Sequence, residues 1–271
     1  MNGGPIRAIF RVSGMSGPEG TMNAVEALLA TMRQELPVRL VSYRLPADTG
    51  LVIVDEVNGF CTVGCGNLAP PAADAQIAQM VERSDALARA CRAKMRPILA
   101  FLDTHEPDRP EPPYPPHCIR GTGEENLVPQ LVWLESDPDV TLIRKDCING
   151  FVGAIEPATA RGQHGLSHNK LVDWINLNRL EAVVVVGICT DICVMDLVLT
   201  LLSARNHGLA PTLRDIVVYE PACATYDLPR ATAEELGLPM TSAHPKWPTH
   251  HIGLYCMASR GAILASELDG V

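Results

Sequence analysis

The sequence predicts an α/β fold in which a parallel, Rossmann-like sheet carries helices on both faces. Two observations lead to this prediction: short apolar runs alternate with longer segments of helical periodicity, and several of the runs contain no polar residue. Strands buried on both faces have such continuous runs, whereas half-exposed strands alternate apolar and polar residues. Of the 271 residues, 47% are hydrophobic, which is enough for a sizeable core.

The elements are expected in a regular order along the chain. Residues 1–49 are predicted to form an N-terminal extension, partly helical or flexible, with a helix near 22–35, and residues 50–271 a single domain. Polar or turn-forming residues follow each predicted strand. The predicted strands are 51–54, 98–102, 140–143, 183–186 and 216–219, with 262–265 as a candidate for the last. The predicted helices are 76–95, 169–177, 191–207 and 248–259; in the third, Val194, Leu197, Val198, Leu201 and Leu202 form a core-facing stripe.

Composition and charge exclude several classes of function. Lys and Arg number 22 against 31 Asp and Glu, a net charge of −9, which argues against a phosphate-binding face and hence against a nucleic-acid partner. No apolar run approaches the ~18 residues of a membrane span, so no membrane association is expected. Nine cysteines, an odd number, in a chain with no secretory signal favour a reducing compartment. We expect the cytosol, with the nucleus as an alternative; an organellar transit segment has little support.

Polar residues follow four of the predicted strands. Asp55, Asp103 and Lys145 come after the first three, and the turn 187–193 follows the fourth. In a doubly wound sheet the ligand lies outside the carboxyl ends of the strands. Each residue alone is more typical of a helix cap or a loop anchor, but their joint position predicts a site at this edge.

Cys193 is a candidate nucleophile. It falls in the first turn of a predicted helix, where backbone N–H groups and the helix dipole favour a thiolate. Asp55 could accept the thiol proton and Lys145 could balance the charges. Free amides of the preceding turn could serve as an oxyanion hole. The alternative is a small buried hydrophobic residue, the more common fate of a lone cysteine.

Asp103, His105 and His117 are candidate metal ligands. Residues two apart in an extended segment project to the same side, so Asp103 and His105 can face one point, to which a Pro-rich loop could return His117. Two histidines and one carboxylate leave positions open for water or substrate, as in catalytic metal sites. The Asp-x-His pattern alone is a weak signal.

With these residues in view, the chain resembles the nicotinamidases of the isochorismatase-like cysteine hydrolase superfamily, and particularly their plant-type members. The similarity runs in family order through residues 50–266. The segments that carry it are Gly50–Gly64, Phe101–His105, Tyr114–Thr122, Arg144–Gly153 and Gly187–Val194. The resemblance implies the isochorismatase-like hydrolase fold for residues 50–271 and the hydrolysis of nicotinamide to nicotinic acid and ammonia, a step of NAD salvage.

The resemblance also implies a role for each catalytic residue. Cys193 would be the nucleophile, Asp55 the base and proton shuttle, and Lys145 the charge partner of both. A cis peptide is expected at Ile188–Cys189, which would aim the backbone amides of Cys189 and Cys193 at the substrate oxygen.

The expected metal is one divalent ion on Asp103, His105 and His117, with zinc favoured over iron or manganese and no organic cofactor. The metal and its waters would face the pyridine nitrogen of nicotinamide. Phe60 and Tyr114 match aromatic positions beside the substrate ring, although several microbial members have Trp at the position of Tyr114.

Two further departures, Val57 where many members have Gln and Gly59 where Asp is common, affect only the polarity of the pocket. A homo-oligomer is expected. Two alternatives to the nicotinamidase remain: a related cysteine amidase acting on another aromatic or small amide, and a catalytically silent metal-binding relative. Asp55, Lys145 and Cys193 are all present, which argues against the silent relative.

Overall fold

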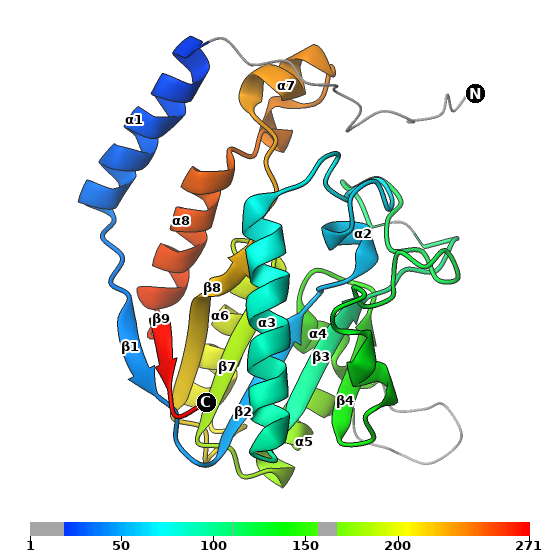
Figure 1. Cartoon of the computed structure of the whole chain (residues 1–271), viewed down its shortest axis with the longest axis vertical. Helices are drawn as coiled ribbons and strands as arrows, with labels where there is room; N and C mark the ends of the chain where they lie inside the picture. Colours follow the sequence, from blue (N-terminus) through cyan, green and yellow to red (C-terminus); the bar gives the residue numbers. More distant parts are fainter. Residues whose placement is uncertain (1–18, 110, 157–166) are drawn as a thin grey trace.

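The main sheet of the described residues has seven strands, all parallel, whose order in space differs from their order in the chain (Figure 1). The computed structural model describes residues 19–109, 111–156 and 167–271, so the first part of the predicted extension and any transit segment lie outside the described residues. The strand order is β1-β9-β8-β7-β2-β3-β4. The strands are β1 (Val41–Arg44), β2 (Thr49–Val54), β3 (Ile98–Asp103), β4 (Val140–Lys145), β7 (Ala182–Ile188), β8 (Asp215–Ala224) and β9 (Ile263–Asp269). A small antiparallel pair joins β5 (Ile155–Glu156) and β6 (His168–Asn169).

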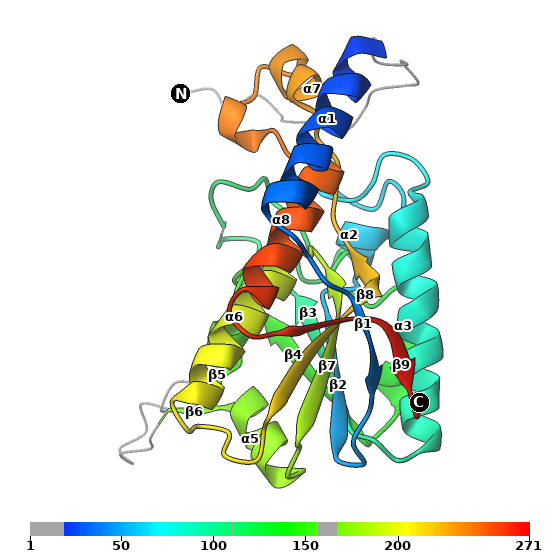
Figure 2. The same cartoon turned by 90° about the vertical axis from the view of Figure 1, so that its left-hand side faces the viewer.

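Helices cover both faces of the sheet, as Figure 2 shows. One face packs on α5 (Lys170–Leu177), α6 (Cys193–Asn206) and α8 (Lys246–Ala258). The other face packs on α3 (Ala75–Ala93) and on the segment 127–134. The remaining short helices are α2 (Asn58–Cys61), α4 (Gly150–Gly153), α7 (Arg230–Glu235) and the 3₁₀ turns η1 (Val132–Ser136) and η2 (Met240–Ser242). This architecture confirms the predicted fold class.

The central strands are buried on both faces. Every residue of β2, β3 and β7 is buried, which explains their continuous apolar runs. Helix α3 starts with a side-chain cap: Asp74 accepts hydrogen bonds from the backbone N–H groups of Gln76 and Ile77, as expected of an Asp N-cap. None of the described helices has both the length and the apolar character of a membrane span.

The N-terminal part of the chain differs from the prediction in one respect. Residues 41–44, expected to belong to the extension, form β1, which pairs in parallel with β9 at the edge of the main sheet. Its residues alternate between half-buried and exposed, so the continuous apolar run that marks the central strands is missing here. The preceding helix, α1 (Glu19–Glu35), lies along α8 (Figure 1), and His251 Nε2 of α8 lies 2.9 Å from the carbonyl oxygen of Leu36.

The strand order reverses at β2. The chain runs outward from β2 to β3 and β4 on one side, and from β7 to β8 and β9 on the other. Ligands of open α/β sheets bind in the crevice at such a switch point, beyond the carboxyl ends of the strands. Asp55, Asp103, Lys145 and the turn after β7 therefore lie at one edge.

Gly187 allows β7 to pack closely on β2 at this edge. Its φ is +123°, and a Cβ placed on it would lie 2.1 Å from the carbonyl oxygen of Val54. Residue 187 also faces Val54 in the ladder. Any side chain here would push apart the two strands that end in Asp55 and in the turn 189–193.

We expect Gly187→Ala to lower the free energy of unfolding by about 2 kcal/mol or more beyond the effect of Gly208→Ala. Gly208 is a matched control because its φ is +88° and no atom lies within 4 Å of the position that a Cβ would take there, so it reports only the ~1–2 kcal/mol cost of a left-handed backbone. Urea unfolding of the two variants measures the difference. Equal destabilisation would contradict the close-packing argument.

Candidate active site

Lys145 lies at the centre of the site. Its ammonium group, at the end of β4, is fully buried, 2.9 Å from Asp55 Oδ2 and 2.9 Å from Asp103 Oδ1. It also donates a hydrogen bond of 2.9 Å to the carbonyl oxygen of Cys147. Strand register explains this meeting, because Asp103 and Lys145 are paired neighbours on β3 and β4. The three acceptors match the three donors of an ammonium group.

Asp55 is held in an unusual backbone conformation directly after β2. Its φ is +54°, in the left-handed region that Asp tolerates better than most residues, and its N–H donates to the carbonyl oxygen of Phe101 at 3.0 Å. Burial raises the pKa of Asp55 to about 6, although the positive charge of Lys145 partly opposes this shift. Asp55 Oδ1 has no hydrogen-bond partner among the described residues. The carboxylate therefore keeps the capacity to accept a proton.

Cys193 is the first residue of α6, with its Sγ 4.0 Å from Lys145 Nζ. Burial raises the pKa of this thiol well above its usual value, against the opposing effect of the Lys145 charge. The resting sulfur is therefore a thiol that needs a base, and Asp55 shares the same ammonium partner. The sequence pattern predicts a thiol in the first helical turn, and the structure puts it at the very start of the helix.

Asp103 joins this cluster to the two histidines. While its Oδ1 faces Lys145, its Oδ2 lies 3.0 Å from His105 Nε2 and 3.2 Å from His117 Nε2. One potential ligand atom from each of the three residues lies within 4.8 Å of the others, and all three residues are buried. His117 Nδ1 lies 2.8 Å from the carbonyl oxygen of Pro115, an outer contact that typically orients a ligating histidine. The donors of this cluster suit a divalent metal ion.

Glu111 is a neighbour of the donor cluster that sequence reasoning missed. Its Oε2 lies 3.6 Å from His105 Nε2 and 3.7 Å from His117 Nε2. Its Oε1 accepts a hydrogen bond of 2.9 Å from the backbone N–H of Ile148, which holds the carboxylate beside the histidines. The only sequence signal was its position in the Pro-rich loop between His105 and His117.

A cavity of about 510 Å³ opens onto these groups. Asp103, His117 and Cys193 line it, whereas Asp55 and Lys145 lie behind this lining. Phe60 and Tyr114, the two predicted aromatic residues, line it as well. Their ring centroids lie 5.6 Å and 6.1 Å from that of His117, so both rings stand beside the candidate metal ligands.

Residues after β8 complete the wall of the cavity, and sequence reasoning missed them. Tyr226, Leu228, Leu238, Pro239, Thr241 and Ser242 all belong to this group. The only signal in the sequence was the Pro-rich character of residues 239–248, which marks a long connection without saying what it faces. The peptide bond between Ile188 and Cys189 is cis, as the family resemblance implies.

Comparison with protein families places this arrangement in a known class. A family model described as the isochorismatase domain matches residues 49–236. The chain therefore belongs to the isochorismatase family. The match spans β2 to α7 and includes every site residue predicted from the sequence.

The chain is also similar to individual proteins. It is 49% identical over 248 residues to Nicotinamidase 1 of Arabidopsis thaliana, a match that covers 90% of this chain and 97% of that protein. The crystal structure of a nicotinamidase from Bacillus subtilis superposes with a TM-score of 0.55 at 20% identity, covering 81% of this chain and 99% of that one. A pyrazinamidase of Pyrococcus horikoshii in complex with zinc gives a TM-score of 0.54 at 20% identity, covering 80% and 98%. At such identities these two structures support the fold alone.

Removal of one histidine should weaken metal binding. We expect His117→Ala to lower the affinity for Zn²⁺ by at least about 10–100-fold, the loss that even an outer partner of a ligand can cause. Competition with a chromophoric chelator measures the affinity, and His168→Ala serves as the control because the His168 side chain is 51% exposed and lies on β6, outside the donor cluster. Unchanged zinc affinity in His117→Ala would rule out this residue as a ligand.

Proposed function

We propose that this protein is a nicotinamidase, which hydrolyses nicotinamide to nicotinic acid and ammonia and so acts in NAD salvage. The observation that carries the proposal is that one buried ammonium, Lys145, lies beside the Cys193 thiol, the Asp55 carboxylate and the Asp103 oxygen opposite the histidines. A cysteine amidase needs the first two groups, and Asp103 belongs with His105 and His117 to a cluster that could hold a metal ion as a partner for a pyridine nitrogen. The 49% identity to a protein named Nicotinamidase 1 supports the same substrate.

In the first half of the reaction, Asp55 accepts the proton of the Cys193 thiol as the sulfur attacks the carboxamide carbon. The new S–C bond produces a tetrahedral oxyanion, while Lys145 balances the negative charge that the sulfur and the carboxylate exchange. Asp55 then returns the proton to the leaving nitrogen as the C–N bond breaks. Ammonia departs and a thioester on Cys193 remains.

In the second half, water replaces the amide nitrogen. Asp55 takes a proton from the attacking water, and the C–S bond breaks as the tetrahedral intermediate collapses. The proton returns to the sulfur, which restores the thiol and releases nicotinic acid. In each half of the reaction, Asp55 starts as a carboxylate, accepts a proton from the attacking group and then returns it to the leaving group. The same residue therefore serves first as base and then as acid.

The backbone N–H groups of Cys189 and Cys193 are our proposed oxyanion hole. Cys193 is the first residue of α6, and the first N–H groups of a helix have no intrahelical partner. A donor in such a position can meet a developing negative charge without rearrangement, and loss of one oxyanion donor typically costs ~10²-fold or more in rate.

Asp103, His105 and His117 would hold a divalent ion, for which we propose zinc ahead of iron or manganese. The ion would supply a Lewis-acidic partner for the pyridine nitrogen, which fixes the ring. Phe60 and Tyr114 would contact the ring itself, since both line the cavity beside His117. No organic cofactor enters this scheme. We also propose that the enzyme is cytosolic, on the basis of its nine free cysteines. The family resemblance supports the further proposal that it forms a homo-oligomer.

We expect the purified protein to release ammonia from nicotinamide, and Cys193→Ala to lower kcat by at least about 10⁴-fold, because loss of a nucleophile leaves only binding and electrostatic effects. Cys256→Ala is the matched control, since Cys256 is a free cysteine of α8 that does not line the cavity. A coupled ammonia assay gives both rates. Full turnover by Cys193→Ala would exclude the proposed mechanism, and no turnover by zinc-loaded wild type would favour a silent relative.

The elevated pKa of Asp55 predicts a pH dependence. The base must be ionised, and its pKa is raised to about 6, chiefly by burial. We therefore expect kcat/KM to be level above this pH and to fall toward tenfold per pH unit below it, because the protonated carboxyl cannot accept the thiol proton. The measurement is kcat/KM for nicotinamide from about pH 5 to 8. A level profile across that range would contradict the assignment of Asp55 as the base.

A further inference from the structure

The cavity is larger than the proposed substrate requires. Its volume of about 510 Å³ lies in the range of roughly 300–1,000 Å³ that typically accommodates drug-sized ligands. A single pyridine ring with a carboxamide occupies only the part beside Cys193 and His117. The rest is bounded by Tyr226 and by the segment 228–242, and we call this part the outer compartment.

The outer compartment is mainly apolar. Its walls include Leu228, Leu238 and Pro239, together with the hydroxyl-bearing Thr241 and Ser242 and the ring of Tyr226. No charged side chain of the segment 228–242 lines the cavity in the described structure. An apolar group fits this lining, whereas a phosphate or a second carboxylate does not.

Tyr226 is held firmly in this wall. Its ring stacks on the imidazole of His244, with centroids 3.9 Å apart and planes within 11°. His244 in turn lies 2.7 Å from Asp191 Oδ2 through Nε2 and 3.0 Å from the carbonyl oxygen of Tyr226 through Nδ1. Both ring nitrogens of His244 therefore face acceptors. These two contacts fix the orientation of the imidazole and so of the Tyr226 ring stacked on it.

Asp191 connects this stack to the loop that carries the nucleophile. It precedes Cys193 by two residues, and its other oxygen, Oδ1, accepts a hydrogen bond of 2.7 Å from Thr225 Oγ1. Hydrogen bonds from His244 and Thr225 lower the pKa of Asp191 although burial opposes them, so the carboxylate is charged. Gly253 of α8 packs against its backbone, where a Cβ would lie 2.7 Å from the Asp191 Cα.

The segment 228–242, which closes the compartment, is held in place by hydrogen bonds at its two ends. Leu228 and His244 form an antiparallel bridge with backbone hydrogen bonds of 2.8 Å and 2.7 Å. Beyond it, the backbone N–H of Lys246 donates to Asp227 Oδ1 at 2.9 Å, and the Lys246 ammonium pairs with Asp74 at the start of α3. The wall is therefore fixed relative to Cys193.

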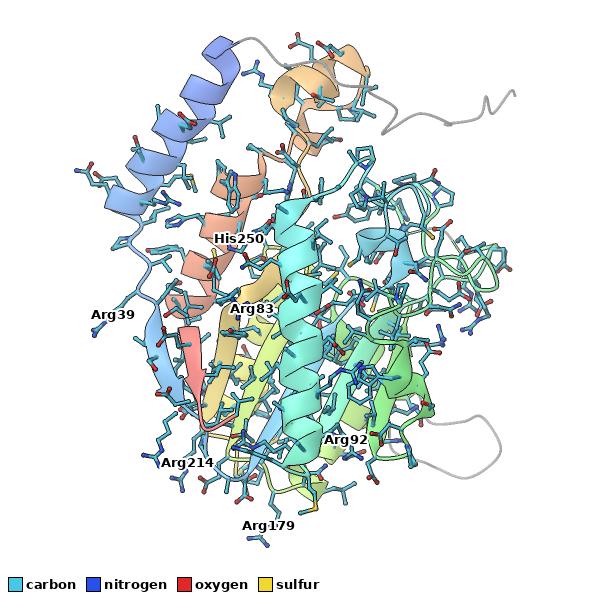
Figure 3. All side chains as sticks on the ribbon, in the orientation of Figure 1. Arg39, Arg83, Arg92, Arg179, Arg214 and His250 are labelled. Carbon is cyan, nitrogen blue, oxygen red and sulfur yellow. The ribbon has the colours of Figure 1, made fainter. Side chains whose placement is uncertain are left out.

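The loop before the nucleophile is fixed from α8 as well. Thr190 Oγ1 lies 2.9 Å from His250 Nδ1, and Gln76 Nε2 of α3 lies 3.3 Å from the same nitrogen. Figure 3 shows His250 on the side of α8 toward α3. The loop 189–193 and the wall 226–244 thus share one rigid support.

We propose that the outer compartment is a subsite for an apolar substituent on the aromatic ring of the amide, and that Tyr226 is the specificity-determining residue that sets its size. The proposal rests on the proposed function, since the ring must enter with its carboxamide at Cys193. The substrate class is accordingly ring-alkylated pyridine carboxamides in addition to the unsubstituted one. His244 and Asp191 act as positioning residues, because they hold the Tyr226 ring and do not line the cavity.

The test compares kcat/KM for nicotinamide with kcat/KM for nicotinamides methylated or ethylated at each free ring carbon in turn. A methyl group buried in the subsite contributes roughly fourfold to binding, which offsets part of any loss in rate. We therefore expect the wild type to hydrolyse at least one alkylated amide with a kcat/KM within about 30-fold of that for nicotinamide. If every alkylated amide is slower by more than this, the subsite does not exist. If nicotinamide itself is not hydrolysed, the proposed function fails instead, so the two failures are distinguishable.

Variants locate the effect in the compartment. Leu238→Trp fills it, and we expect the ratio of kcat/KM for the accepted alkylated amide to that for nicotinamide to fall at least tenfold. Tyr226→Ala enlarges it and should raise the ratio for the ethylated over the methylated amide, whereas Tyr226→Phe keeps the ring and should restore the wild-type ratio. Met240→Ala is the matched control, because Met240 lies in the same segment, is 46% exposed and does not line the cavity.

The same ratios can overturn the assignment of Tyr226. If Leu238→Trp and Tyr226→Ala give the ratios of Met240→Ala, the compartment does not contact the substrate. His244→Ala separates positioning from simple stability: we expect it to shift the ratio in the direction of Tyr226→Ala. An unchanged ratio in a folded His244→Ala protein would show that the stack does not position the ring.

Discussion

The buried ammonium of Lys145 is the interaction on which the rest of the site depends. Burial of a charge is costly unless it is paired, and this charge is paired twice, with Asp55 after β2 and Asp103 at the end of β3. Those two carboxylates in turn would be unstable as neighbours without the cation. Strands β2, β3 and β4 must therefore stay adjacent and in register, and the site and the sheet stabilise one another.

Asp103 extends this dependence to the histidines. One of its oxygens pairs with Lys145 and the other faces His105 and His117, so the buried ion-pair cluster and the candidate metal ligands share a residue. On the other side of Cys193, Asp191 does the same for the Tyr226 wall through His244. Asp103 and Asp191 thus connect the surroundings of Cys193 to both sides of the cavity.

The predictable part of the molecule was the part whose environment imposes a local pattern. The central strands are buried on both faces, which requires apolar runs, and the residues after those runs are the site, because parallel strands end at one edge. Asp55, Asp103, Lys145 and Cys193 could all be found in this way. Strand β1 could not, since its alternating burial and four-residue length resemble many surface segments.

The sequence by itself determined the central strands of the sheet, the edge where the candidate site lies, and the motifs that resemble the isochorismatase-like hydrolases. Only the tertiary structure decided what closes the cavity: Glu111 beside the histidines, and Tyr226 with the segment 228–242 along the opposite wall. These residues lie in long connections without periodicity, so their neighbours depend on where the loops return. Contacts between residues far apart in the sequence, such as Asp191 with His244 and Lys246 with Asp74, fix where these loops pack. No local sequence pattern encodes such contacts.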